Sequence, residues 1–165
     1  MLKIVTLPNP KLRERSTEID RDFLLSPEIQ TLIIEMSPKM YTSDGIGLAA
    51  PQVGYNIRLC IIGKEALKLD KKNKLPVEFD LILVNPTWQK TSRKTNIDEE
   101  GCLSVPGIIG KVKRQSDIEV EAWNEKGEKI KFAAHNYFAR VIQHEVDHLD
   151  GILFIDKAKD IQEIK

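Results

Sequence analysis

The apolar positions of the chain recur with a helical period in two segments. At the start of the first, Ser26 and Pro27 have the residue types of an N-cap and a first helical turn. Pro38 lies inside this pattern, and we expect it to kink or end the helix because proline removes a backbone donor. The second segment runs from Asn136 to Leu149, and Gly151 is placed to end it. The apolar side chains at helical spacing are Ile29, Leu32, Ile33, Met36 and Met40 in the first segment and Phe138, Val141, Ile142, Val146 and Leu149 in the second.

Shorter apolar segments predict β-strands. Residues 59–62 and 81–84 are wholly apolar, which is typical of strands covered on both faces, and a charged loop, 64–78, separates them. Apolar and polar residues alternate in 118–122 and again in 130–132, which predicts an antiparallel hairpin with one face in water. Because strands and helices do not alternate regularly along the chain, the pattern indicates an α+β fold.

Length and charge narrow the class of protein. A chain of 165 residues is expected to fold as one domain, residues 1–165, and we expect its last short strand at 152–155. Lys plus Arg and Asp plus Glu both total 25, so a formal net charge of zero favours neither direct readout of nucleic acid nor a membrane as partner. No apolar stretch is long enough to cross a bilayer, and the first residues lack a secretory-signal pattern. We therefore expect a soluble, cytoplasmic protein.

The two cysteines are too few for a disulfide framework and fit a reducing compartment. Cys60 lies inside an apolar run, where a thiol is expected to be buried as a small hydrophobic group. Cys102 lies outside any apolar run, which leaves it open to a role as a ligand or nucleophile.

The second predicted helix carries the sequence His144-Glu145-Val146-Asp147-His148. Two histidines four residues apart lie on one face of a helix, so both imidazoles can reach one metal ion. Glu145 is then placed to reach a water molecule beside that ion. The chain has three histidines, and two of them stand in this pattern, which favours a hydrolytic metal site over two unrelated histidines.

A catalytic metal usually has three protein ligands, so one more residue is needed. Asp147 and Asp150 are candidates, although they are close to the histidines along the same helix. His135 is a further candidate, but a histidine just before a helix is more simply interpreted as a capping or surface residue. Cys102 lies in the short segment 100–104 and offers a thiolate.

The segment Gly45-Ile46-Gly47-Leu48-Ala49-Ala50 matches the G-x-G-x-x-A fingerprint of dinucleotide-binding proteins. Its context argues against that function, because a helix precedes it and no room remains for a crossover helix before residue 59. The glycines instead favour close approach of the backbone to a substrate, and such a strand can pair with an extended peptide.

Taken together, the segments 45–52, 100–104 and 144–148 resemble the three signature motifs of the peptide deformylases, in that family's order. The resemblance extends from Pro8 through Asn85-Pro86 to the residues after Gly151. It implies the family's fold, an α+β domain of antiparallel strands packed around a central metal-binding helix, with an N-terminal helix in addition. It also implies the family's reaction, which removes the formyl group from the N-terminal formylmethionine of nascent chains and releases formate.

The resemblance implies a role for each matching residue. The implied metal ligands are Cys102, His144 and His148. In the family they hold Fe²⁺ in the native form, and Zn²⁺, Ni²⁺ or Co²⁺ can substitute. Glu145 becomes the general base and then the general acid. The implied oxyanion donors are the Gln52 amide and the backbone N–H of Leu103, and the implied peptide-binding groups are the backbones of Ile46, Gly47 and Gly101.

A preference for methionine requires an apolar cavity next to the metal. One turn before His144 on the predicted helix, Val141 suits a wall of that cavity. Arg140 shares the same side by spacing, and we expect its long side chain to extend into water. The implied partners are formylated nascent chains and, transiently, the ribosome, although the short tail after Lys157 argues against a C-terminal docking helix.

Two other functions remain to be separated from deformylation. A metallopeptidase would cut internal peptide bonds and release no formate. A non-enzymatic metal-binding or ribosome-associated module would need neither a base nor an oxyanion donor, so the presence of Glu145 and Gln52 argues against it.

Overall fold

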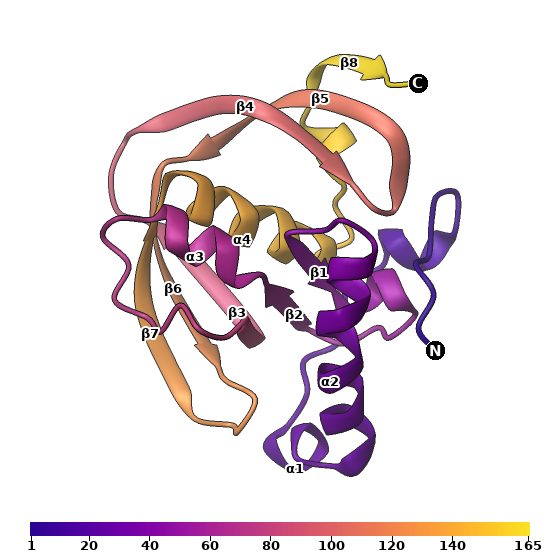
Figure 1. The fold of residues 1–165 in the computed structure, drawn as a ribbon, viewed down its shortest axis with the longest axis vertical. Helices are drawn as coiled ribbons and strands as arrows, with labels where there is room; N and C mark the ends of the chain where they lie inside the picture. The colour runs from indigo at the N-terminus through magenta and orange to yellow at the C-terminus, as the bar shows by residue number, and fades with distance from the viewer.

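The computed structural model describes all 165 residues and contains two antiparallel sheets. The larger sheet has the order β1-β2-β3-β6-β7, and the smaller has the order β4-β5-β8. Helix α4 (Asn136–Leu149) lies between them, as Figure 1 shows. The α+β prediction, with antiparallel strands around a central helix, is therefore confirmed. The strands are β1 (Gly47–Ala49), β2 (Leu59–Ile62), β3 (Leu81–Lys90), β4 (Thr95–Cys102), β5 (Val105–Gln115), β6 (Asp117–Trp123), β7 (Lys129–His135) and β8 (Lys159–Glu163).

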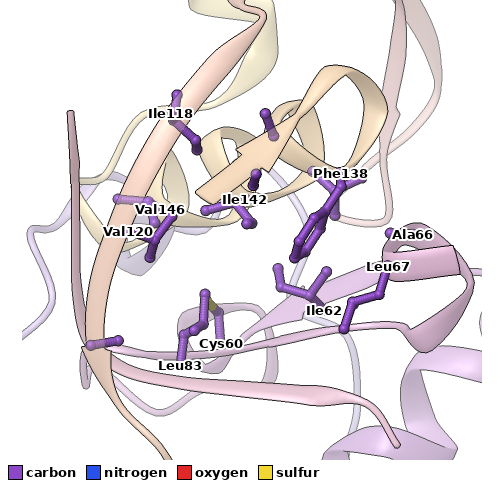
Figure 2. Close-up of a cluster of buried hydrophobic side chains, with 14 of the residues drawn as sticks. Cys60, Ile62, Ala66, Leu67, Leu83, Ile118, Val120, Phe138, Ile142 and Val146 are labelled. Atoms are coloured by element: carbon purple, nitrogen blue, oxygen red, sulfur yellow. The ribbon is translucent and has the colours of Figure 1, made fainter. Parts of the chain in front are cut away.

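The apolar side of α4 forms one core with the larger sheet. Phe138, Ile142 and Val146 of the helix are at most 5% exposed. Figure 2 shows them close to Cys60, Ile62 and Leu83 of the sheet. The helix ends at Leu149, and Gly151 follows with φ of +72°, where a Cβ would lie 2.4 Å from the carbonyl oxygen of Arg13. Gly151 thus ends the helix as predicted, in a conformation and a space that favour glycine.

Helix α2 (Pro27–Thr42) covers the opposite face of the same sheet. Its buried side chains, among them Leu32 and Met36, share a second apolar cluster with Leu59 and Ile61 of β2, whereas Cys60 and Ile62 join the α4 cluster. Strand β2 is therefore covered on both faces, which confirms the interpretation of its unbroken apolar run and of Cys60 as a buried residue.

Several local predictions are wrong. Of the two outcomes expected at Pro38, a kink or the end of the helix, the ending is wrong, because the helix continues to Thr42. The supposed loop 64–78 begins with α3 (Lys64–Leu69), and 152–155 contains the start of a 3-10 turn, Phe154–Asp156, in place of a strand. The last strand, β8, comes later. The remaining helical segments are α1 (Arg21–Leu24) and the 3-10 turns Pro10–Arg13 and Ala50–Val53.

The pattern of apolar residues in the sequence did not indicate the β4–β5 hairpin. Strand β4 has the sequence TNIDEEGC, and only Glu100 in it is buried. The strand pairs with β5 over most of its length, from Thr95 opposite Gln115 to Gly101 opposite Ile109. Because such a strand has almost no apolar residues, it shows no alternation of apolar and polar positions from which it could be predicted. None of the helices has the length and apolar character needed to cross a membrane.

Candidate active site

The end of β4 and two successive turns of α4 bring three metal-ligand side chains together. Cys102 is the last residue of β4, and His144 and His148 are one turn apart on α4. One ligand atom from each of the three lies within 4.8 Å of the others, and the Cys102 sulfur is 3.3 Å from Nε2 of His148. One thiolate and two imidazoles form a donor set that suits several first-row divalent metals.

The other residues considered as a third ligand lie in contacts of their own. Asp147 pairs with Arg114 and Lys157, and Asp150 accepts a hydrogen bond from Arg58 at 2.9 Å. His135 precedes α4 as its N-cap residue, and its Nδ1 lies 2.8 Å from Asp117. None of the three belongs to the group of converging ligand atoms, so Cys102 is the third member of the cluster.

Glu145 is buried beside the cluster with one oxygen free. The side chain is 3% exposed, and Oε2 has no hydrogen-bond partner in the chain. Burial raises the pKa of Glu145 to about 7, although the neighbouring His144 acts in the opposite direction. A Cβ on Gly47 would lie 2.6 Å from Oε1 of Glu145. Gly47 is therefore needed to make room for this carboxylate, in addition to any role of its backbone toward a substrate.

Gln52 is held with its amide nitrogen toward the sulfur. Its Oε1 accepts a hydrogen bond from the backbone N–H of Ala49 at 2.9 Å. This contact leaves Nε2 to face Ser104 Oγ at 3.2 Å and Cys102 Sγ at 3.6 Å. Leu103 follows the cysteine in the short turn between β4 and β5. Two groups capable of donating hydrogen bonds thus lie next to the metal-ligand cluster.

A cavity of about 680 Å³ opens over these groups, between the edges of the two sheets. Strand β1 pairs only with β2, and β4 pairs only with β5, so each presents a free backbone edge. Ile46, Gly47 and Gly101 line the cavity from those two segments, and Val141 lines it from α4. An extended peptide can pair with such an edge, so the site offers a place for a peptide next to the cluster.

The prediction that Arg140 extends into water is wrong. Its side chain is 3% exposed, and Nη1 donates to Glu100 Oε2 at 2.5 Å and to the carbonyl oxygen of Val112 at 2.8 Å. Nη2 donates to the carbonyl oxygen of Asn96 at 3.0 Å. The guanidinium therefore links α4 to both strands of the β4–β5 hairpin. The Arg140 guanidinium is buried because it pairs with the buried carboxylate of Glu100. The spacing of residues along the helix does not indicate such a partner.

Glu100 connects this buried network to the metal-ligand cluster. Oε1 lies 2.8 Å from Nδ1 of His144, and both oxygens accept hydrogen bonds from Arg114, at 2.8 and 2.9 Å. Burial alone would raise the pKa of Glu100, but the hydrogen bonds from His144 and Arg114 hold it well below the usual range. The carboxylate thus orients the histidine ring with its other nitrogen toward the cluster. Sequence analysis missed this role, although Glu100 precedes Cys102 by two residues and therefore shares its strand face.

An α+β fold that places a thiol, two imidazoles and a buried carboxylate beside a peptide-sized cavity defines a metal-dependent hydrolase. The family model of polypeptide deformylase matches residues 1–163. The chain belongs to this family of metalloenzymes, which remove the N-formyl group from newly made polypeptides.

Individual relatives agree with this assignment. The chain is 35% identical to the peptide deformylase of Desulforudis audaxviator, over 100% of this chain and 98% of that protein. It is 40% identical to the chloroplastic peptide deformylase 1B of Oryza sativa, but it spans only 54% of that protein's length. The crystal structure of peptide deformylase from Thermotoga maritima matches with a TM-score of 0.84 and 33% identity, over 96% of this chain and 98% of that one.

Proposed function

We propose that this chain removes the formyl group from formylmethionyl N-termini, with Glu145 as the residue that moves the proton. One observation carries the proposal. The carboxylate of Glu145 is buried at the floor of the cavity, has an oxygen without a partner and adjoins the cluster of Cys102, His144 and His148. A structural metal site would leave no unpaired acid beside it, because an uncompensated buried carboxylate destabilises the fold.

The residues present fit a divalent metal. The Cys102 sulfur and Nε2 of His148 are in contact. Nδ1 of His144 is hydrogen-bonded to Glu100, which leaves Nε2 of His144 for a metal. We propose Fe²⁺ as the ion in the cell, with Zn²⁺, Ni²⁺ or Co²⁺ able to replace it, since this donor set suits all four. When bound, the ion supplies Lewis acidity that makes water available as a nucleophile near neutral pH.

Glu145 takes up and returns one proton. Its carboxylate accepts a proton from the attacking water as the oxygen bonds to the formyl carbon. As the bond between the formyl carbon and the amine nitrogen breaks, the same group delivers the proton to the nitrogen, so formate and a free amine are released. A pKa raised by burial to about 7 suits a group that must do both at neutral pH.

Gln52 and Leu103 stabilise the charge that forms on the carbonyl oxygen. The Gln52 amide is fixed by Ala49, so its nitrogen is oriented before the substrate arrives. The backbone N–H of Leu103 is the second donor in this proposal. A donor held in place in a site that excludes water can lower a barrier by about 3 kcal/mol.

The peptide chain binds along the free edges of the two sheets. In this proposal the backbones of Ile46 and Gly47 on one side and Gly101 on the other hold it extended. Val141, which is 4% exposed and lines the cavity, forms part of the wall for the methionine side chain.

The setting proposed for this activity is the cytoplasm, where the ribosome presents formylated chains. Two cysteines that remain free support a reducing compartment. Residues 1–165 are proposed to form one catalytic domain, because α4 contacts strands of both sheets and so joins them.

The test is formate release from a formylmethionyl peptide under reducing, oxygen-poor conditions, which protect the thiolate from oxidation. Replacing Glu145 by Gln should lower kcat/KM by about 10²- to 10⁴-fold, because a general base is removed while the metal ligands remain. Metal content, measured by elemental analysis, should not change. The control is Glu128→Gln, an exposed carboxylate in the β6–β7 turn, which should retain full activity.

Two results would contradict the proposal. If Glu145→Gln retains most of the activity with normal metal content, Glu145 does not transfer the proton. If the wild-type protein cuts internal bonds of casein and releases no formate, the chain is a peptidase.

A further inference from the structure

Residues 4–7, which we call the N-terminal segment, connect two turns of the catalytic site. The backbone N–H of Val5 donates to the carbonyl oxygen of Gln52 at 2.7 Å, and the N–H of Leu7 donates to the carbonyl oxygen of Ser104 at 3.0 Å. In Figure 1 the indigo start of the chain lies at the right edge of the molecule, next to the turn that follows β1. One short stretch of backbone thus holds both the turn after β1 and the turn between β4 and β5.

Each of these two turns carries one of the proposed oxyanion donors. Gln52 supplies its side-chain amide from the 3-10 turn Ala50–Val53, and Leu103, directly before Ser104, supplies its backbone N–H. The N–H of Leu103 donates no hydrogen bond within the chain, so it is free to donate to a substrate. The spacing of the two donors therefore depends on how the two turns are joined.

The two turns are joined in two ways. Through side chains, Nε2 of Gln52 donates to Ser104 Oγ at 3.2 Å, and an amide nitrogen has a second hydrogen for another acceptor. Through the backbone, the connection runs from Gln52 to Val5 and from Leu7 to Ser104. A side-chain contact can persist through rotation when the turns shift, whereas the backbone connection fixes the two carbonyl groups relative to each other.

The hydrogen bonds of the N-terminal segment are directed only at these turns. Among residues 3–7, the N–H groups of Val5 and Leu7 are the two that donate within the chain. The N–H of Lys3 has no partner, and the side chain of Lys3 is exposed. Lys3 therefore offers a matched position at which a change of backbone leaves the two turns alone.

Apolar side chains hold the segment on both sides. Ile4 and Leu103 pack against one apolar cluster, and Leu7 and Cys102 pack against another. Thr6 between them is exposed. The two donor N–H groups thus extend from a backbone that packing keeps in place.

We propose that Val5 and Leu7 are positioning residues that set the spacing of Gln52 and Leu103. This inference rests on the proposed function, because the two donors matter only if negative charge forms on a carbonyl oxygen between them. Neither Val5 nor Leu7 lines the catalytic cavity, so both act through the turns that they hold. Fixed donors lower the barrier because they already point at the place where the charge develops. A small shift of one turn should therefore slow turnover without preventing substrate binding.

The first test is Val5→Pro in the metal-loaded full chain, because proline lacks the N–H that holds Gln52. We expect kcat for formate release to fall by about 10- to 100-fold, as a misplaced group near the reacting atoms can cause. KM should stay within about twofold of wild type, because the lost interaction belongs to the transition state. The control, Lys3→Pro, should keep the wild-type kcat.

A double variant separates positioning from general stability. If Val5 acts through Gln52, adding Val5→Pro to Gln52→Ala should lower kcat by less than about twofold further, because no amide remains to be positioned. If the two losses multiply in full, Val5 acts on something other than Gln52 and the proposal is wrong.

Leu7→Ala tests the other end of the segment and leaves every backbone donor in place. The shorter side chain loosens the packing beside the turn between β4 and β5, so kcat should fall by about threefold or more. Leu7→Met refills most of the space and should restore turnover. This pair decides the question if Val5→Pro does not fold, and a wild-type kcat in Leu7→Ala would contradict the proposal.

A spectroscopic measurement tests the position of the amide without any assay of activity. In the zinc-loaded, ¹⁵N-labelled protein, the side-chain NH₂ signals of Gln52 are identified by their loss in Gln52→Ala. They should shift or broaden in Val5→Pro and stay in place in Lys3→Pro. Unchanged signals in Val5→Pro would overturn the inference even if kcat falls. A wild-type chain that releases no formate would contradict the proposed function instead, and the Gln52 signals would still show whether the segment positions the amide.

Discussion

The two sides of α4 are held in the fold by opposite means. Toward the larger sheet, Phe138, Ile142 and Val146 pack into an apolar core. Toward the β4–β5 hairpin, Arg140 and Asp147 pair with Glu100 and Arg114, and all four residues are at most 8% exposed. Packing on the apolar side requires only side chains of suitable shape and volume. On the charged side, each buried charge requires its partner, because an unpaired buried charge destabilises the fold.

This difference explains how the metal-ligand cluster is placed. Cys102 comes from the hairpin and the histidines come from α4, so their distance depends on the charged interface between these elements. Glu100 is in that interface and also touches His144. The charged side should therefore control metal binding as well as stability, and the apolar side should control stability alone.

The largest effect is expected from Arg114→Met. The change leaves Glu100 and Asp147 buried without their main partner, and breaking a buried pair in this way costs about 3–5 kcal/mol. Urea unfolding at one saturating metal concentration would measure the decrease in stability. The matched control is Arg13→Met, whose partner Asp156 is also 2.5 Å away but whose side chain is 42% exposed. It should cost less than about 1 kcal/mol, and equal decreases in both variants would mean that burial does not distinguish the two pairs.

A smaller effect, on metal binding, is expected from Glu100→Gln. The neutral amide no longer holds the His144 ring through a charged hydrogen bond, and removing such a partner typically weakens metal binding by about 10- to 100-fold. Competition with a fluorescent zinc chelator gives the affinity without any assay of activity. The neighbouring exposed residue provides the control, Glu99→Gln, which should leave the affinity as it is. A normal affinity in Glu100→Gln would show that His144 is oriented without this carboxylate.

The same contrast shows which parts of the molecule the sequence could predict. Apolar periodicity indicated α2, α4 and the β6–β7 hairpin because each buries a regular apolar face, and an unbroken apolar run indicated β2. It missed β4, which has almost no apolar residue, and it placed Arg140 in water because spacing along a helix cannot reveal a carboxylate from another strand. The short spacing of His144 and His148 indicated a metal site. The residues alone left four candidates for the third ligand, and only the fold shows that Cys102 lies beside the two histidines.

The smallest effect, from Ile142→Val, tests the apolar side of the comparison. The side chain is fully buried under the larger sheet, and removal of one methylene group should lower the free energy of unfolding by about 0.5–1.5 kcal/mol. The control Ile34→Val lies at a position that is 73% exposed on α2 and should change stability by less than about 0.5 kcal/mol. Urea unfolding separates the two variants.

Metal affinity decides whether the two sides of α4 really act differently. Ile142→Val should bind zinc as tightly as wild type in the chelator competition, because the apolar core can adjust to the removal of a methylene group without moving the hairpin. If the variant instead weakens zinc binding as much as Glu100→Gln does, packing against the larger sheet also sets the positions of His144 and His148. The charged pairs would then share control of the metal-ligand cluster with the core.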